Sequence, residues 1–369
     1  MNNPRCSLCG AKMKKNGKTK AGTQRWRCTA CNATSTRKID NAAKALRTFL
    51  AWLLSKRSVA EPGMSRTTFW RKFGWAWRIW PVAPYTGEAY DTVFLDGIWL
   101  KRDAVVLIAR GESHTLARHL ARSECAEAWA ALMMRLPAPA MAVSDGSPGL
   151  AEAARTVWPG TRIQRCTFHA ANQVKRCTTL NPKLECGKEL LGIANGLKDA
   201  KDARSAALWL AEHNDWCTRW GKFLREFTLK DGKRVYAHER PRKARRGLTR
   251  LVKEGTLFTF VEMQEKYGGV WDPTNNAIES DNARIREMLR LHRGLPLMHR
   301  VKAVLWWCYM HTENPLSAAE ILRVMPTDDE VDGLFASASG RDGRDGGAPE
   351  ECGSGIVWSE FHMPTEYRR

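Results

Sequence analysis

The stretch that decides the fold is Thr92-Val93-Phe94-Leu95-Asp96-Gly97-Ile98-Trp99-Leu100, an apolar run interrupted by a single acid. Apolar, aromatic and β-branched residues in so short a run favour a buried β-strand. A carboxylate inside such a strand is costly unless a partner compensates its charge. Asp96 is therefore the first candidate functional residue, with a turn or cap role as the alternative.

The residues after this strand continue an α/β pattern. Two strand-like runs, 104–109 and 114–120, form an expected meander, and a helix is predicted from about 123 to 135. The next short buried strand, 140–144, ends at Asp145-Gly146. Since α/β folds place ligands where strands exit, Asp145 is a second candidate site residue, and a turn or cap role is again the alternative.

A third acid, Glu279, lies near the start of a predicted helix. Glu279, Asn282 and Arg286 share one face of this helix by their spacing, and Arg290 lies nearby. One carboxylate among cations suits a metal ion held against a phosphate backbone. The alternative is a capping-box-like pair of Asn276 and Glu279.

Residues 1–40 are basic and contain too little apolar sequence to form a core. They contain two Cys-x2-Cys pairs, formed by Cys6, Cys9, Cys28 and Cys31. Four thiolates at this spacing complete a closed Zn²⁺ site that supplies folding energy, whereas a redox-active pair is the alternative. We expect a structural zinc ribbon that presents Arg25 and Arg27 to DNA.

Residues 41–88 are predicted to be helical and rich in Trp and Arg. Within them, a Gly, a Ser N-cap at Ser65 and a basic helix resemble the second half of a helix-turn-helix, whose first residues meet base edges. The candidate DNA contacts on this helix are Arg66, Thr67 and Arg71. The alternative is a packing helix with a solvated basic face.

The charge of the whole chain favours a polyanionic partner. Its 369 residues include 59 Lys and Arg against 39 Asp and Glu, which gives a formal charge of +20. This balance argues against an ordinary acidic metabolic enzyme and favours nucleic acid. The most apolar stretch, 301–310, is far shorter than the about 20 residues that a membrane span needs. Without an apolar signal region at the N-terminus, the chain is expected in the cytoplasm, associated with the nucleoid.

Four segments, taken together, resemble the Mutator-like DDE transposases of bacterial insertion sequences. They are Phe94-Leu95-Asp96-Gly97-Ile98, Val143-Ser144-Asp145-Gly146, Gln164-Arg165-Cys166-Thr167-Phe168-His169 and residues 274–282. The first two acids are 49 residues apart and the second and third are 134 apart, which leaves room for the helical insertion that this family has. The resemblance covers roughly residues 90–310.

This resemblance implies an α/β fold with an RNase H-like catalytic core and an all-helical insertion, preceded by a zinc ribbon and a helix-turn-helix-like segment. The expected divisions are a zinc ribbon at 1–40, a helical DNA-binding segment at 41–88, the first part of the core at 89–169, the insertion at 170–265, the last part of the core at 266–326 and a flexible tail at 327–369.

By the same resemblance, the catalytic acids would be Asp96, Asp145 and Glu279, with His169 facing the cleft. For Cys166 and His169, a buried Cys and a hydrogen-bonded His is the alternative. Asp281 is an acid where the family more commonly has an apolar residue, so it is the alternative to Glu279.

The implied chemistry is DNA cleavage followed by joining of the freed 3′-hydroxyl to target DNA. Three carboxylates would hold two Mg²⁺ or Mn²⁺ ions about 4 Å apart for this reaction, without a covalent enzyme intermediate.

The expected partners are double-stranded DNA, at transposon ends and target, and a second copy of the chain in a homodimer. Arg286 and Arg290 are further expected DNA contacts. The alternatives are an RNase H-like nuclease without strand transfer and a zinc-ribbon DNA-binding regulator that needs none of the acids.

Overall fold

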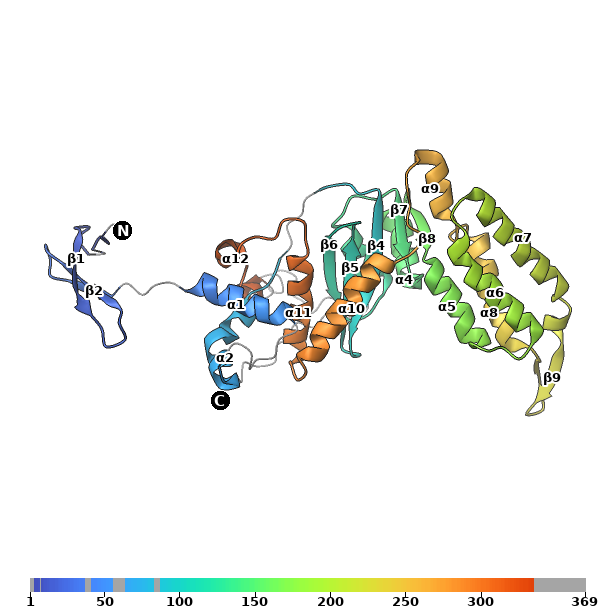
Figure 1. Ribbon diagram of the computed structural model, residues 1–369, viewed down its shortest axis with the longest axis horizontal. Helices are drawn as coiled ribbons and strands as arrows, with labels where there is room; N and C mark the ends of the chain where they lie inside the picture. Colours follow the sequence, from blue (N-terminus) through green and yellow to red (C-terminus); the bar gives the residue numbers. More distant parts are fainter. Residues whose placement is uncertain (1–2, 7, 37–40, 56–63, 83–86, 335–369) are drawn as a thin grey trace, which may run out of the picture. The chain divides into compact units, whose positions relative to one another are not determined.

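The computed structural model describes residues 3–6, 8–36, 41–55, 64–82 and 87–334 (Figure 1). These residues fall into two compact units, one within 1–49 and 316–324 and the other within 50–315 and 325–369. Among the described helices, none has the length and apolar character to span a membrane.

The N-terminal segment forms a three-stranded antiparallel sheet in the order β1-β2-β3. The strands are β1 (Met13–Lys18), β2 (Gln24–Cys28) and β3 (Thr34–Thr36). Among its described residues, only Cys6, Met13 and Cys28 are buried, and they pack against a few partly buried neighbours. So small a core supplies little hydrophobic stabilisation, which leaves the cysteines to stabilise this fold.

A five-stranded mixed sheet forms the centre of the larger unit, in the order β6-β5-β4-β7-β8. The strands are β4 (Thr92–Leu100), β5 (Ala104–Arg110), β6 (Thr115–Ala121), β7 (Met141–Ser144) and β8 (Arg162–Arg165). The first three are antiparallel neighbours, whereas β7 and β8 run parallel to β4. The predicted α/β class is confirmed, and the strand that contains Asp96 is the central one.

Helices cover both faces of this sheet. Alternate residues of β4, such as Val93 and Leu95, pack in one apolar cluster with α3 (Ala126–Met133) and α4 (Pro148–Val157). The opposite face, which includes Asp96, meets α10 (Asn276–Leu291), while α11 (Leu297–Met310) packs against β4 and β6. Because side chains alternate along a strand, Asp96 projects away from the main apolar cluster and toward α10.

The insertion forms its own apolar cluster, with Trp209 and Trp216 among its buried residues. Its helices are α5 (Thr167–Thr178), α6 (Glu185–Gly196), α7 (Ala203–Arg219), α8 (Glu239–Lys253) and α9 (Thr259–Tyr267), with short 3₁₀ turns η2 (Leu197–Asp199) and η3 (Phe223–Arg225).

The expectation that the insertion is all-helical is wrong at one place. Strands β9 (Phe227–Lys230) and β10 (Lys233–Tyr236) form an antiparallel hairpin. Its turn residues, Asp231 and Gly232, have φ angles of 53° and 72°. Positive φ at both central residues is what a two-residue hairpin turn requires, and Asp-Gly provides it at low cost.

The helical segment that precedes the core contains α1 (Ala42–Leu54), α2 (Arg66–Phe73) and η1 (Gly74–Arg78). The Ser65 hydroxyl accepts a hydrogen bond from the Thr68 N–H at 3.2 Å, as the sequence predicts for an N-cap. Phe69 and Phe73 are buried on one face of α2. Residues 56–63, between the two helices, lie outside the described residues.

Residues near the C-terminus anchor a buried lysine. Lys302 of α11 is 1% exposed, and its ammonium donates to the Trp77 carbonyl at 2.6 Å and to the Asp328 carboxylate. Asp328 starts a helical stretch, 328–334, in the segment expected to be a flexible tail, and residues 335–369 lie outside the described residues. Burial lowers the pKa of Lys302, so its positive charge depends on the Trp77 carbonyl and the Asp328 carboxylate.

In the smaller unit, which includes residues 316–324, the last described helix is α12 (Ala318–Val324).

We predict that Asp328→Ala lowers the free energy of unfolding by about 3 kcal/mol, because it leaves a buried ammonium without its carboxylate. The matched control is Asp329→Ala, because Asp329 pairs with Arg78 where both side chains are exposed. That change should cost less than about 1 kcal/mol. Urea unfolding of both variants measures the difference, and equal losses would contradict a structural role for Asp328.

Candidate active site and zinc centre

Asp96 is held by two hydrogen bonds in the middle of β4. Its Oδ1 accepts from the Gly97 N–H at 2.8 Å, and its Oδ2 accepts from Asn282 Nδ2 at 2.6 Å. Burial and then the negative charge of Glu279, with a smaller effect of Asp145, together raise the pKa of Asp96 to about 7, although the Gly97 hydrogen bond lowers it. The carboxylate is thus fixed in place while its charge is disfavoured.

Asp145 follows directly on β7, the parallel neighbour of β4. Leu95 pairs with Ser144 in the strand register, so Asp96 and Asp145 come next on adjacent strands. The Ser147 N–H donates to Asp145 Oδ1 at 3.0 Å, which orients the carboxylate at the strand exit. Register therefore explains why two acids that are distant in sequence interact.

Glu279 lies in the first turn of α10 and is half-buried. Its Oε1 is 3.2 Å from His169 Nε2, and its Oε2 is 3.8 Å from Arg286 Nη1. The His169 hydrogen bond lowers the pKa of Glu279, so this acid stays ionised. The N-cap side chain of α10, Asn275, makes no capping bond and instead donates to the Leu95 carbonyl at 3.1 Å. Its partners thus direct Glu279 toward His169 rather than toward the helix end.

His169 lies on α5, whose N-cap is the buried Cys166. The Asn275 N–H donates to Cys166 Sγ at 3.3 Å, which ties this turn to the start of α10. The neighbouring Cys166 and then Glu279 raise the pKa of His169 to about 10. This direction favours the charged imidazole beside Glu279.

Asp96 interacts electrostatically with both Glu279 and Asp145. In the described part of the chain, only the four N-terminal cysteines form a group of three or more ligand atoms within 4.8 Å of one another. Each of the acids Asp96, Asp145 and Glu279 offers carboxylate oxygens, the donors that Mg²⁺ and Mn²⁺ prefer. A cation among them would relieve the repulsion that raises the pKa of Asp96, so the residues fit such an ion.

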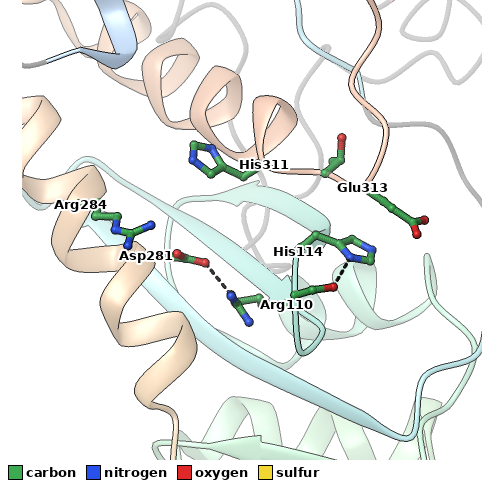
Figure 2. Close-up of a pocket in the computed structure, with 8 residues that line it drawn as sticks. Arg110, His114, Asp281, Arg284, His311 and Glu313 are labelled. Carbon is green, nitrogen blue, oxygen red and sulfur yellow. Dashed lines mark hydrogen bonds and ion pairs between the residues drawn. The ribbon is translucent and has the colours of Figure 1, made fainter.

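Asp281 is engaged on another side of α10. Its Oδ2 lies 2.6 Å from Arg110 Nε, and both side chains are 13% exposed. This pair lines a pocket of about 370 Å³ together with residues that include His114, Arg284, His311 and Glu313 (Figure 2). This ion pair favours Glu279 over Asp281 as the third acid.

Sequence reasoning missed two residues beside the acids. The Arg165 guanidinium packs so closely over Gly146 that a Cβ there would collide with it, and Arg165 feels the charge of Asp145. Glu124 accepts a hydrogen bond from Trp99 Nε1 at 2.6 Å, and burial, followed by the charge of Asp145, raises its pKa. Arg165 stands within the motif Gln164–His169, where Cys166 and His169 draw the attention, and Glu124 belongs to no motif of the sequence.

Asn282 was placed on the Glu279 face by spacing, but its contact with Asp96 was not anticipated. It is fully buried. A buried amide three residues after the acid on the same helix face is the signal that could have found it.

The four N-terminal cysteines form a cluster that could hold a zinc ion. Their sulfur–sulfur distances are 3.6 Å for Cys6 and Cys31, 3.4 Å for Cys9 and Cys28 and 3.5 Å for Cys9 and Cys31. A tetrahedral site with Zn–S bonds of about 2.3 Å separates its sulfurs by about 3.8 Å. The backbone N–H groups of Cys31 and Ala30 lower the pKa of the Cys28 thiol to about 6, which favours the ligating thiolate.

The predicted DNA contacts all lie on exposed surfaces of their elements. These residues are Arg25 and Arg27 on β2, Arg66, Thr67 and Arg71 on α2, and Arg286 and Arg290 on α10. Their exposure leaves them accessible to a polyanion.

Comparison with known families identifies the class of protein. Residues 87–312, which include all three acids and His169, match a model of transposases, a class of DNA-cleaving and DNA-recombining enzymes. The model is described as "Transposase, Mutator family", it covers more than half of the chain, and the protein belongs to this family. A search of curated proteins finds no match. Membership confirms the resemblance inferred from the four motifs and implies that the protein binds DNA.

We predict one zinc per chain in the purified full-length protein. Cys28→Ser should release it and make residues 8–36 sensitive to limited proteolysis, because the ribbon has little other core. Cys177→Ser, which changes a cysteine outside the cluster, should retain the zinc. A zinc-free wild-type protein with reduced thiols and a protease-resistant ribbon would refute the site.

Proposed function

We propose that this Mutator-family protein is a DDE transposase that binds the ends of an insertion sequence, cleaves DNA and joins the freed 3′-hydroxyl to target DNA. The observation that carries the proposal is the position of Asp96 on the central strand, beside Asp145 at the end of the parallel strand β7 and within reach of the negative charge of Glu279. A buried carboxylate whose pKa is raised by burial and by other carboxylates is typical of functional sites.

The topology supports an RNase H-like core as part of this proposal. Three antiparallel strands are followed by two parallel strands, in the order β6-β5-β4-β7-β8. The first acid lies on the central strand, the second follows its parallel neighbour and the third comes from a helix that covers the same face. The acids therefore come from three separate segments of the chain, and the fold gathers them.

Asp96, Asp145 and Glu279 are the residues that would hold Mg²⁺ or Mn²⁺. When bound, such ions lower the pKa of an attacking hydroxyl and neutralise charge that develops on the phosphate. The protein's own contribution is positional. Asn282 fixes the orientation of Asp96, and the Ser147 N–H fixes that of Asp145.

Two successive attacks at phosphorus account for the proposed reaction. In the first, water attacks the phosphorus of a phosphodiester and displaces its 3′-oxygen, which leaves as a free 3′-hydroxyl opposite a 5′-phosphate. In the second, that hydroxyl attacks a target phosphorus in the same site and displaces the 3′-oxygen of the target strand, so one phosphodiester replaces another and no protein nucleophile is consumed. The protonated His169, beside Glu279, would contact the scissile phosphate with its positive charge.

The modules before the core would bind DNA in this proposal. The zinc ribbon would present Arg25 and Arg27, and α2 would present Arg66, Thr67 and Arg71, to the sequence at the ends of the element. Arg286 and Arg290 on α10 would contact the backbone nearer the site. We further propose that the protein acts as a homodimer on double-stranded DNA in the cytoplasm, associated with the nucleoid.

We predict that Asp96→Asn, Asp145→Asn and Glu279→Gln each abolish Mg²⁺-dependent cleavage of an end-containing duplex while end binding stays within about twofold. Neutral amides retain the shape of the side chains but lose the charge that a cation requires. Asp281→Asn is the control, because Asp281 pairs with Arg110 and should affect stability more than the cleavage rate.

Cleavage that survives in any of the three variants would remove that residue from the catalytic set. Loss of cleavage in Asp281→Asn with retention in Glu279→Gln would exchange their roles. A substrate with a pre-nicked end separates transposase from nuclease, since only a transposase transfers the exposed 3′-hydroxyl to a second duplex. Dispensability of all three acids would favour a DNA-binding regulator.

We predict that His169→Ala lowers the cleavage rate by about 100-fold with little change in DNA affinity, because it removes a cation beside the scissile phosphate. Cleavage under single-turnover conditions and thermal melting measure the two effects. An unchanged rate with a lower melting temperature would assign Cys166 and His169 to a structural turn instead.

A further inference from the structure

Helix α8 is strongly basic. Its 15 residues contain seven Lys or Arg and one acid, Glu239. The buried residues of the helix, among them Ala244 and Leu248, face the rest of the insertion, where α8 packs on α5 and α6. Hydrophobic packing therefore accounts for one side of α8 and leaves the basic side unexplained.

Four of these cations form one exposed stripe on α8, which we call the α8 stripe: Lys243, Arg246, Arg250 and Lys253. Their spacing of three, four and three residues keeps them on the same helix face. Over ten residues the stripe extends about 15 Å. A duplex carries one phosphate charge per about 1.7 Å of its axis, so several phosphates lie within this length.

The stripe is poorly neutralised by the protein itself. Arg250 lies 3.8 Å from Glu254, a long ion pair between exposed side chains. Lys243, Arg246 and Lys253 form no ion pair among the residues that the structure describes. Like charges aligned on one face repel one another, which a polyanion along the stripe would relieve.

The C-terminal end of α8 is fixed beside the catalytic strands. The Arg165 N–H donates to the Thr256 carbonyl at 2.6 Å, and Gln164 Nε2 donates to the Leu257 carbonyl at 3.0 Å. These bonds attach the residues after α8 to β8, the parallel neighbour of β7. The stripe thus ends beside β8, the neighbour of the strand that leads into Asp145.

Arg165 continues the line of cations toward the acids. Its guanidinium packs over Gly146, the residue after Asp145. Because the Arg165 N–H also donates to the Thr256 carbonyl, just after α8, Arg165 lies between the C-terminal end of the stripe and Gly146. Positive charge therefore continues from the stripe through Arg165 to the residue that follows Asp145.

We propose that the α8 stripe is a binding track for the phosphate backbone of duplex DNA, which it guides to the Asp145 edge of the site. Its position beside the catalytic acids rests on the proposed function, whereas DNA binding by the stripe does not. A lipid surface fits less well, because no large exposed apolar side chain in the described chain lies on α8 to anchor it.

The test compares two triple variants of the full-length, zinc-loaded protein. The stripe variant is Lys243→Gln, Arg246→Gln and Lys253→Gln. The control is Lys198→Gln, Lys201→Gln and Arg204→Gln, which removes the same charge from exposed positions between α6 and the start of α7. Fluorescence anisotropy with a duplex of unrelated sequence, at several salt concentrations, reports affinity and its salt dependence.

We expect the stripe variant to bind duplex DNA at least about tenfold more weakly than wild type. The slope of log K against log salt concentration should become less steep by about 2 to 3, because each lost phosphate contact removes about 0.9 from it. The control should remain within about twofold of wild type. Arg246→Gln alone should lower the slope by about 1, which keeps the test available if the triple variant fails to fold.

Wild-type affinity and slope in the stripe variant would overturn the proposal, as would equal losses in both triple variants. Unchanged DNA binding with weaker binding to phosphatidylglycerol vesicles would assign the stripe to a membrane and overturn it too. This assay needs no cleavage, so its result is independent of whether the three acids catalyse strand transfer.

Discussion

The Asp96 carboxylate is the group on which the rest of the site depends. Gly97 and Asn282 hold its two oxygens, while burial and the charges of Glu279 and Asp145 oppose its ionisation. The Asn282 contact also fixes α10 against β4, and α10 in turn presents Glu279. The central strand therefore places the first acid and, through one amide, orients the helix that supplies the third.

This arrangement costs stability in the absence of a cation. The pKa of Asp96, about 7, lies above its usual value of 3.8, so the unfolded chain releases this proton at a lower pH than the folded chain does. Ionisation of Asp96 thus lowers stability as pH rises from about 4 to 7, and the full cost remains above pH 7. His169 reduces this cost, because its positive charge beside Glu279 lowers the pKa of Asp96. In sites that bind metal through several close carboxylates, the bound ion offsets the electrostatic repulsion between them.

Much of this account could be predicted from the sequence, and the limits are physical. The strands around Asp96 and Asp145 follow from short apolar runs, and the four-cysteine cluster follows from cysteine spacing, because both signals are local. The β9–β10 hairpin was also predictable from its Asp-Gly turn but was overlooked. By contrast, the Asp281–Arg110 pair, the Asn282 bond to Asp96 and the position of Arg165 over Gly146 are contacts between distant segments. Only the folded register and helix packing create them.

The central claim is that the three acids form a site for a divalent cation, and thermal melting with Mn²⁺ at pH 8 tests it most directly. At this pH Asp96, whose pKa is about 7, is mostly ionised, and an ion that binds the folded state alone raises its melting temperature. The account predicts that Mn²⁺ raises the melting temperature of the wild-type protein by several degrees and has little effect on Asp96→Asn. No increase in the wild-type protein, or an equal increase in both, would contradict it.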